Sequence, residues 1–379
     1  MNIGIVLYPT YGGSGVVATE LGKGLAERGH HVHFISYARP MRLNEFHENI
    51  SFHEVSFSAY PLFEYPPYDL ALASQLVDII RYQKLDLVHV HYAIPHATSA
   101  WLANQILAED GKQVPFITTL HGTDITIVGS DPSYAPVVTF SINKSDGVTA
   151  VSNYLKEETN RRFNIEKEIA VIPNFIDLKR FRRTEKSHFK KALCPNGEKV
   201  LVHVSNFREV KRVRDTVEIF HRVLKAGIKA HLLLVGDGPD RQLVENRCRQ
   251  LGICGNVRFL GKQEKVEDIL SIADLFLIPS GSETFGLAAL EAMSCSVPVI
   301  SSDIGGLPEL NLHGETGYLC SLGDVEAMGN YAVRLLSDEE EHSRFSRNAR
   351  KRAEFFEIEK VVNQYESYYL EIMSRSEPE

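Results

Sequence analysis

The chain has 379 residues, of which 44% are hydrophobic and 24% charged, and its mean hydropathy is −0.15. This balance is typical of a folded globular protein and excludes a disordered or fibrous chain. The 41 basic and 49 acidic residues give a net charge of −8, which predicts no general attraction to nucleic acid or to an anionic membrane. Any anion that the protein binds must therefore be held by a local site, and the length favours two domains.

The sequence gives no indication of a membrane span, a secretion signal or a disulfide framework. It contains no run of about 18 apolar residues, and its first residues, MNIGIVLYPT, lack the basic region of a signal peptide. The five cysteines are odd in number and scattered, and they include no C-x-x-C pair. We therefore expect reduced thiols in a cytoplasmic protein without stable membrane association.

Short runs rich in valine, isoleucine and leucine alternate with longer segments of helical period, which predicts an α/β protein with parallel strands and crossover helices. The runs are nearly continuous in apolar residues, as expected for strands that are covered on both faces. In the first half of the chain they predict strands near residues 3–8, 32–36, 87–91, 116–120 and 147–151. In the second half they predict strands near residues 200–205, 231–235, 257–260, 275–279 and 297–301.

A boundary between two doubly wound parallel-sheet domains is predicted at residues 171–177, where a proline and an asparagine end a strand and a polar, basic stretch follows. The N-terminal domain then spans residues 1–172 and the C-terminal domain residues 173–355, with a last helix at about 356–373. In open sheets of this kind ligands bind beyond the carboxyl ends of the strands. The loops that follow the strands are therefore the places where functional residues are expected.

The first predicted strand is followed by a glycine-rich loop and a helix. Gly13 and Gly15 let the backbone approach an anion or a sugar at the helix N-terminus, and Ser14 with the amides after it could hold a carboxylate. Gly13, Gly15 and Ala18 also match the dinucleotide pattern G-x-G-x-x-A, so an NAD-linked oxidoreductase is an alternative. However, the second strand ends at Ser36 rather than at the acid that would bind a ribose. A tight turn with close helix packing is the structural alternative.

Basic residues follow the first strand of the second half, in the run SNFREVK at residues 205–211. Arg208 and Lys211 lie where the next helix is expected to begin, a place that disfavours cations because a helix N-terminus carries partial positive charge. Their placement is explained if they face a polyanion such as a diphosphate. A solvated helix face is the alternative.

Two carboxylates, Glu283 and Glu291, lie eight positions apart in a strand, loop and helix segment. On one continuous helix they would stand about 80° apart around the axis, so we place Glu283 in the loop and Glu291 two turns into the helix. The amides of Phe285, Gly286 and Leu287 would then face a phosphate, and the two acids would accept hydrogen bonds from hydroxyls on either side of it. A nucleoside diphosphate sugar has hydroxyls in both places.

This segment resembles the E-x7-E motif of the retaining glycosyltransferases of family 4, which have the GT-B fold of two Rossmann-like domains facing a central cleft. The resemblance implies that Glu283 lies by the donor sugar and that Glu291 binds the nucleotide ribose. It also implies that the last helix packs back on the N-terminal domain. The resemblance covers most of the chain and includes residues 12–15, 171–177, 205–211, 234–239, 259–261 and 298–309.

The same resemblance assigns further residues to the donor and to catalysis. Arg208 and Lys211 match the cations that bind the donor diphosphate. His121, at the end of a strand in the first half, matches a family histidine that faces the donor sugar, so we predict catalytic, donor-positioning roles for His121 and Glu283. The predicted donor-binding set is completed by Gly13, Asn206, Glu291 and the amides of Phe285, Gly286 and Leu287.

Longer segments indicate the acceptor. The runs YPTYGGSGVVATELGKGLAERGHHVHFIS, VHVHYAIPHA and TLHGTDITIVGSDPSY resemble the members of the family that transfer N-acetylglucosamine from UDP-N-acetylglucosamine to the hydroxyl of L-malate, the first step of bacillithiol biosynthesis. Malate needs a small pocket that satisfies two carboxylates. The candidates, for which capping of turns is the alternative role, are Ser14, Tyr92, Thr119 and Asn153.

No cofactor and no metal ion are predicted. His31 and His33, and likewise His89 and His91, share strand faces, but no third ligand stands at a suitable spacing and no H-E-x-x-H motif occurs. Another small or lipid acceptor, an NAD-linked oxidoreductase and a nucleotide-binding module without turnover are the alternative functions. A homo-oligomer is compatible with the sequence, which does not define the oligomeric state.

Overall fold

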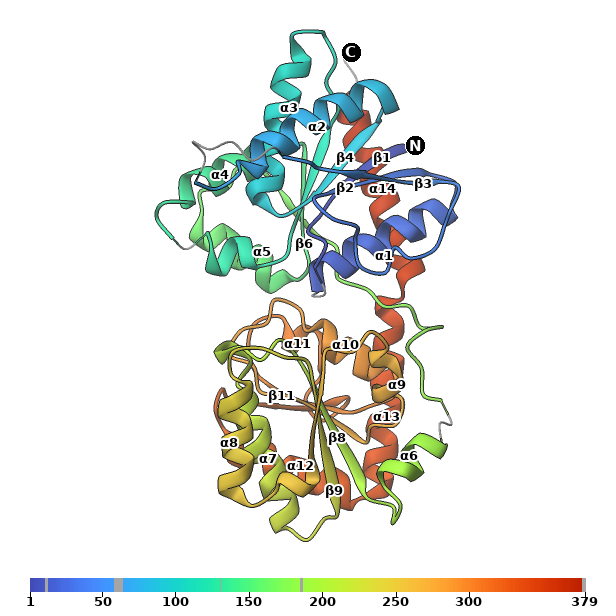
Figure 1. Cartoon of the computed structure of the whole chain (residues 1–379), viewed down its shortest axis with the longest axis vertical. Helices are drawn as coiled ribbons and strands as arrows, with labels where there is room; N and C mark the ends of the chain where they lie inside the picture. The colour runs from blue at the N-terminus through green and yellow to red at the C-terminus, as the bar shows by residue number, and fades with distance from the viewer. Residues whose placement is uncertain (11–12, 58–63, 130, 185–186, 377–379) are drawn as a thin grey trace. The chain divides into compact units, whose positions relative to one another are not determined.

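The computed structural model describes residues 1–10, 13–57, 64–129, 131–184 and 187–376. Tyr11 and Gly12 of the predicted glycine-rich loop lie outside the described residues. The chain forms two compact units, coloured along the sequence in Figure 1. The first comprises Met1–Asn174 with Ile358–Glu379, and the second Phe175–Glu357.

The first unit is built on a parallel sheet of seven strands in the order β3-β2-β1-β4-β5-β6-β7. Its central strands are almost completely buried because helices pack on both faces (Figure 1), which explains their continuous apolar sequences. The strands are β1 (Asn2–Val6), β2 (His31–Ser36), β3 (Ile50–Glu54), β4 (Leu87–His91), β5 (Phe116–Leu120), β6 (Gly147–Ala150) and β7 (Ile169–Val171). The helices are α1 (Gly13–Glu27), α2 (Tyr68–Gln83), η1 (Ala93–Ala97), α3 (Thr98–Ala108), η2 (Thr123–Ile127), α4 (Ala135–Lys144), α5 (Asn153–Arg162) and α14 (Ile358–Ser376).

The last helix, α14, is part of the first unit, although the whole of the second unit, Phe175–Glu357, separates it from Asn174 in the sequence. It buries Tyr365 and Tyr369, and the Tyr369 hydroxyl lies 2.7 Å from Nδ1 of His89 on β4. Glu366 of the same helix pairs with His30, just beyond the end of α1, at 2.7 Å. These contacts fix the C-terminal helix on the first sheet.

The second unit contains a parallel sheet of six strands in the order β10-β9-β8-β11-β12-β13. The strands are β8 (Lys199–Val204), β9 (Ala230–Val235), β10 (Val257–Gly261), β11 (Leu275–Ile278), β12 (Val299–Ser302) and β13 (Gly317–Cys320). The longer helices are α6 (Ser187–Leu193), α7 (Val213–Lys225), α8 (Arg241–Leu251), α10 (Leu287–Ser294), α12 (Val325–Ser337) and α13 (Glu339–Ala353). The short ones are η3 (Glu209–Lys211), η4 (Cys254–Asn256), α9 (Val266–Leu270), α11 (Leu307–Leu310) and η5 (Glu354–Phe356).

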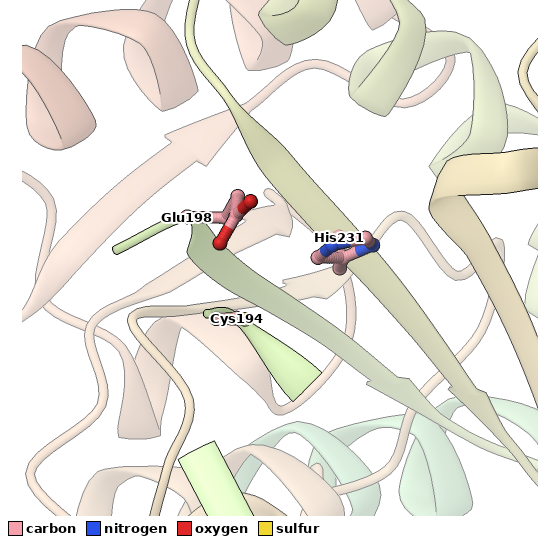
Figure 2. A group of neighbouring side chains, drawn as sticks. All are labelled: Cys194, Glu198 and His231. Carbon is pink, nitrogen blue, oxygen red and sulfur yellow. The ribbon is translucent and has the colours of Figure 1, made fainter. Parts of the chain in front are cut away.

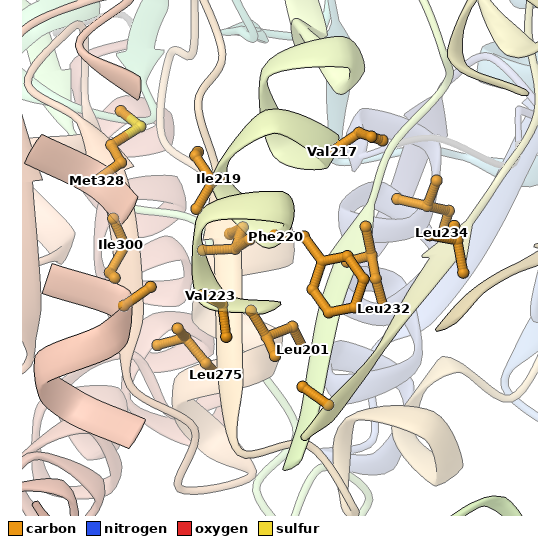
Figure 3. Packing of buried hydrophobic residues seen from close by; sticks show 14 of the residues in the cluster. Leu201, Val217, Ile219, Phe220, Val223, Leu232, Leu234, Leu275, Ile300 and Met328 are labelled. Carbon is orange, nitrogen blue, oxygen red and sulfur yellow. The ribbon is translucent and has the colours of Figure 1, made fainter. Parts of the chain in front are cut away.

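The core of the second unit forms where α7 lies on the sheet (Figure 3). Val213, Val217, Phe220 and Val223 recur at three- and four-residue intervals and are fully buried, so they form one apolar face of the helix. This face packs against strand side chains that include Leu201 of β8 (Figure 3). Burial of such a face, rather than helix propensity alone, holds α7 in place.

The predicted α/β class is confirmed, and each predicted strand corresponds to a strand of the structure. The sequence did not predict β3 and β13, and it indicated β7 only as the strand that ends at the boundary. All three lie at the edges of their sheets. The side chains of β3 are only partly buried, so its sequence, ISFHE, lacks the apolar run of a strand covered on both faces.

The core predicts a difference between two substitutions on neighbouring helices of the second unit. Phe220→Ala should lower the free energy of unfolding by about 3–5 kcal/mol, because it leaves a cavity in the buried cluster. Leu243→Ala on α8, where the side chain is 63% exposed, should change it by less than about 0.5 kcal/mol. Urea denaturation followed by circular dichroism measures both free energies of unfolding. Equal values for the two variants would contradict the placement of Phe220 in the core of the second unit.

Candidate functional site

In the second sheet the direction of winding reverses between β8 and β11, which are neighbours in the sheet. The loops after these strands therefore leave the same edge together, as at the ligand-binding edge of open α/β sheets. The Gly281 N–H donates a hydrogen bond to the Val210 carbonyl at 2.7 Å. Nζ of Lys211 lies 2.6 Å from Oε1 of Glu283, which is 72 positions away in the sequence. The structure thus brings together two of the segments that the sequence predicted to be functional.

Two glycines after β12 hold the backbone at Glu283. The Gly306 N–H donates to the Glu283 carbonyl at 2.9 Å. Gly305 has φ +59°, and a Cβ there would lie 1.9 Å from the same carbonyl oxygen. Only glycine permits this approach, so Gly305 and Gly306 position Glu283 through its backbone. Both glycines lie in the segment 298–309 that carries part of the family resemblance, but no role was predicted for them individually.

The helix after β11 begins later than predicted. Gly286 adopts φ +95° and precedes α10, whose first residue is Leu287. Glu291 therefore lies about one turn into the helix, and the prediction of two turns was wrong. The reason is that the left-handed glycine keeps Phe285 and Gly286 in the loop. Glu291 is only 9% exposed, and the start of α10 places partial positive charge beside this loop.

The loop after β8 presents the basic residues. Lys211 ends the short turn η3, while Arg208 before it is exposed and forms no ion pair with any residue that the structure describes. The neighbouring Asn206 is also exposed, whereas Phe207 between them is fully buried. Phe207 acts as the anchor of the loop, because its N–H donates to the Asp237 carbonyl at 3.1 Å. The loop that carries the predicted cations is therefore anchored by Phe207, and it exposes the guanidinium of Arg208 at the surface.

The first sheet has the same reversal, between β1 and β4. Oγ of Ser14, in the first turn of α1, lies 2.5 Å from the hydroxyl of Tyr92, which follows β4. Tyr92 has φ +98°, a strained value for a residue with a side chain, and such strain is common at functional sites. A Cβ at Gly15 would lie 2.5 Å from the Tyr8 carbonyl oxygen, so this glycine allows α1 to begin against the end of β1. Gly13, by contrast, is exposed, and a Cβ there would meet no atom within 4 Å in the part of the chain that the structure describes.

His121 belongs to a row of histidines at the end of β4 and β5. Its Nε2 lies 2.8 Å from Nδ1 of His91, and the ring of His91 stacks on that of His89 at 4.5 Å. Burial lowers the pKa of His121 and of His89 to about 3, so both imidazoles are neutral near pH 7. A hydrogen bond between two neutral rings needs one N–H and one lone pair, so His91 restricts the tautomer of His121.

Asp124 joins the same loops and was not singled out by the sequence analysis. Its carboxylate accepts hydrogen bonds from the Ala93 N–H at 2.9 Å and from the Gly122 N–H at 3.1 Å. It thereby connects the segment after β4 with the segment after β5. Burial raises its pKa to about 6, while these N–H groups act against the rise. An acid three residues beyond a histidine at a strand end is the pattern that could have found it.

The four predicted acceptor residues do not form one group. Ser14 and Tyr92 are in contact, and burial raises the pKa of Tyr92 to about 12, so its hydroxyl remains a hydrogen-bond donor. Thr119 is completely buried, and its hydroxyl is 2.6 Å from both His89 Nε2 and Thr149 Oγ1. This position inside the unit argues against a contact with an acceptor. Asn153 is exposed at the start of α5, which follows β6.

The two sets of loops suit different chemistry. Exposed or half-buried cations and a helix N-terminus in the second unit are suited to a diphosphate. Hydroxyl donors and neutral imidazoles in the first unit are suited to hydrogen bonds with polar oxygens. Among the described residues one group could hold a metal ion, namely Cys194, Glu198 and His231, and it lies at the amino end of the second sheet, away from these loops. None of the described helices is long and apolar enough to cross a membrane.

In comparisons with known proteins, each half of the chain matches a family model. The family model described as Glycosyltransferase Family 4 matches residues 11–180, and that of Glycosyl transferases group 1 matches residues 184–352. The chain is 48% identical over 375 residues to the N-acetyl-alpha-D-glucosaminyl L-malate synthase of Bacillus anthracis, covering 98% of this chain and 97% of that protein. Its fold is similar to that of a sucrose-phosphate synthase from Thermosynechococcus elongatus, with a TM-score of 0.82, 22% identity and coverage of 99% and 100% of the two chains. It is also similar to HepE of Anabaena in complex with UDP and glucose, with a TM-score of 0.81, 19% identity and coverage of 97% and 99%.

The buried histidines predict a loss of stability of the first unit as the pH falls from about 6.5 toward 4. The pKa is lowered to about 3 for His89 and His121 and to about 4 for His96, whereas in the unfolded chain histidines take up protons below about 6.5. Because the unfolded state binds more protons in this window, the stabilisation is complete above pH 6.5 and is lost on acidification, by roughly 1 kcal/mol per pH unit for each histidine. Asp124 has a raised pKa, so it stabilises the folded unit as the pH falls, but this single group opposes several histidines.

Urea unfolding at several pH values, followed by the fluorescence of Trp101 in the first unit, measures this slope. His96→Phe should make the slope smaller, because it removes one imidazole that takes up a proton in the unfolded chain but not in the folded one between pH of about 6.5 and about 4. His313→Phe, at an exposed position of the second unit, is the control and should leave the slope unchanged. A free energy of unfolding that stays constant between pH of about 7 and about 5 would contradict the neutral, buried histidines.

Proposed function

The chain belongs to glycosyltransferase family 4, and we propose that it transfers N-acetylglucosamine from UDP-N-acetylglucosamine to the hydroxyl of L-malate with retention of the anomeric configuration. The near full-length match to the L-malate synthase of Bacillus anthracis carries this proposal. An NAD-linked oxidoreductase is not supported, because β2 ends at the buried Ser36 and offers no acid for a ribose. We place the enzyme in the cytoplasm, since all five of its cysteines are free.

In the proposed donor site the second unit binds UDP. Arg208 and Lys211, together with the N-terminus of α10, attract the diphosphate, and Asn206 and the amides of Phe285, Gly286 and Leu287 belong to the same surface. Glu291 accepts hydrogen bonds from the ribose, and Glu283 from a hydroxyl of the sugar. The 2.6 Å contact with Glu283 already holds the Lys211 ammonium in place, so little ordering is needed when the diphosphate binds.

We assign the acceptor and part of the sugar to the first unit. The hydroxyls of Ser14 and Tyr92 and the first amides of α1, beginning at Gly13 and Ser14, are donors suited to a malate carboxylate. His121 is neutral, and its tautomer is restricted by His91, so it offers a defined donor or acceptor to the sugar. Asn153 is a further, exposed candidate for the acceptor.

The reaction breaks the bond between the anomeric carbon and the diphosphate oxygen, and the electron pair leaves with UDP. The negative charge that develops on the diphosphate is stabilised by Arg208, Lys211 and the start of α10. The malate hydroxyl forms the new bond on the same face of the sugar, and its proton passes to the departing phosphate. Glu283 orients the sugar in this scheme, and its pairing with Lys211 suits such a role better than that of a nucleophile.

Turnover with defined substrates tests the proposal. UDP should be released at a substantial rate only when UDP-N-acetylglucosamine and L-malate are supplied together, and the product mass should equal that of one N-acetylglucosamine joined to one malate. A panel of other hydroxy acids and sugar acceptors provides the comparison. Failure of malate to support turnover, with efficient use of another acceptor, would overturn the acceptor assignment and leave the family unchanged.

Binding of UDP tests the donor site separately. Lys211→Ala and Glu291→Ala should each weaken UDP binding by about 10- to 100-fold, because each removes a hydrogen bond that involves a charged group. Lys225→Ala, at the opposite end of α7 and exposed, is the matched control and should bind UDP like the unaltered protein. Isothermal titration calorimetry measures the three variants, and normal UDP affinity in both site variants would disprove the assignment.

A further inference from the structure

The geometry points to a binding site for one divalent transition-metal ion of the zinc class, formed by Cys194, Glu198 and His231 at the amino end of the second sheet (Figure 2). Each residue offers one ligand atom, and the three atoms all lie within 4.8 Å of one another. Zinc binds sulfur at about 2.3 Å and nitrogen or oxygen at about 2.0–2.2 Å, which places tetrahedral ligands about 3.3–3.8 Å apart. Small side-chain movements therefore suffice to bring the three atoms around one ion.

The local fold brings these residues together from separate elements. The register pairs Val200 of β8 with His231 of β9, and Glu198 stands two positions before Val200, so the side chains of Glu198 and His231 share one face of the sheet. Cys194 directly follows α6, and the Gly197 N–H donates to its carbonyl at 3.2 Å in the turn that leads to β8. Gly197 has φ +79°, which allows this tight turn. Figure 2 shows Glu198 where the chain enters β8, His231 on the adjacent strand β9, and Cys194 near them.

Two observations indicate a ligand at this place. Nδ1 of His231 is buried and has no hydrogen-bond partner among the residues that the structure describes, an arrangement that is unfavourable unless another group satisfies it. Glu198 is held by Asn196, whose backbone N–H donates to Oε2 at 3.0 Å and whose side-chain amide donates to Oε1 at 2.9 Å. Hydrogen bonds of this kind orient the ligands of metal sites. An oriented carboxylate and an imidazole with an unsatisfied nitrogen thus belong to two residues whose ligand atoms lie within 4.8 Å of each other and of the Cys194 thiol.

The donor atoms select the class of metal. Sulfur, nitrogen and oxygen together suit zinc and similar borderline ions, whereas magnesium and calcium prefer oxygen alone. Cysteine binds metal ions as the thiolate, so binding at Cys194 displaces a proton and becomes tighter as the pH rises. The thiolate and the Glu198 carboxylate would balance the two positive charges of the ion. Three protein ligands leave the fourth position to water.

The position predicts a structural role. The three residues lie at the beginning of β8 and β9, roughly 20 Å from the functional loops at the other end of these strands. A bound ion would tie the turn between α6 and β8 to β9. It would therefore stabilise the folded second unit by mass action without contact with the donor.

Titration of the metal-free, reduced, full-length protein with Co²⁺ tests the site. One equivalent should produce the near-ultraviolet charge-transfer absorption of a cobalt–thiolate bond. Cys194→Ser should abolish this absorption, and Asn196→Ala should weaken binding by about 10-fold or more because it releases Glu198. Cys254→Ser removes the exposed cysteine of the same unit and is the matched control, which should bind like the unaltered protein.

Thermal unfolding with Zn²⁺ gives an independent measurement. Zn²⁺ should raise the melting temperature of the unaltered protein and of Cys254→Ser but not of Cys194→Ser, and a chelator should reverse the rise. UDP binding by Cys194→Ser should be normal, which shows that this variant folds and separates the metal site from the donor site. Cobalt–thiolate absorption that survives in Cys194→Ser, its absence from the unaltered protein, or an unchanged melting temperature with Zn²⁺ would each overturn the proposal.

Discussion

In each sheet the winding of the chain reverses at one pair of neighbouring strands, β1 with β4 and β8 with β11. The functional arrangement depends on this reversal. After the two neighbouring strands the chain turns to opposite faces of the sheet, so the crossover helices leave a crevice at the carboxyl ends of these strands. Ser14 meets Tyr92 at the first reversal, and Lys211 meets Glu283 at the second. Both contacts join segments that are distant in the sequence, so they exist only because the sheet order makes their strands neighbours.

Close backbone contacts fix these loops, and glycines make the contacts feasible. Gly15 lets α1 begin against the end of β1, and Gly305 lets the loop after β12 press on the backbone of Glu283. At Gly238 a Cβ would lie 2.6 Å from the Phe207 carbonyl oxygen, so this glycine supports the loop that carries Arg208. The functional groups therefore stand on loops that are held by main-chain packing. Preorganisation of this kind reduces the ordering that ligand binding requires.

Local charge, rather than the net charge of −8, defines where an anion can bind. In the second unit the cations stand beside a helix N-terminus, and Lys211 is held by an acid from the neighbouring loop. In the first unit burial keeps His121 neutral and raises the pKa of Tyr92, so polar groups there act through hydrogen bonds rather than charge. The second unit thus offers charge at its loops, and the first unit offers hydrogen-bonding groups.

The sequence predicted the buried strands well because an apolar run covered on both faces is a strong local pattern. It did not predict β3 and β13, which are at sheet edges, or the exact start of α10, which depends on the left-handed Gly286. Side-chain direction was equally beyond its reach: Thr119 ends a strand, as predicted, but its hydroxyl turns inward to His89. The group of Cys194, Glu198 and His231 matches no sequence motif, because the register of β8 with β9 brings its members together.

Retention of configuration on malate is the most direct consequence of the proposed chemistry. In UDP-N-acetylglucosamine the sugar is α-linked, so a retaining transfer must give an α-linked product. Proton NMR of the product made from UDP-N-acetylglucosamine and L-malate measures the anomeric coupling constant and locates the linkage. We predict an α-anomer attached to the malate hydroxyl, whereas a β-anomer, or free N-acetylglucosamine released together with UDP, would contradict it.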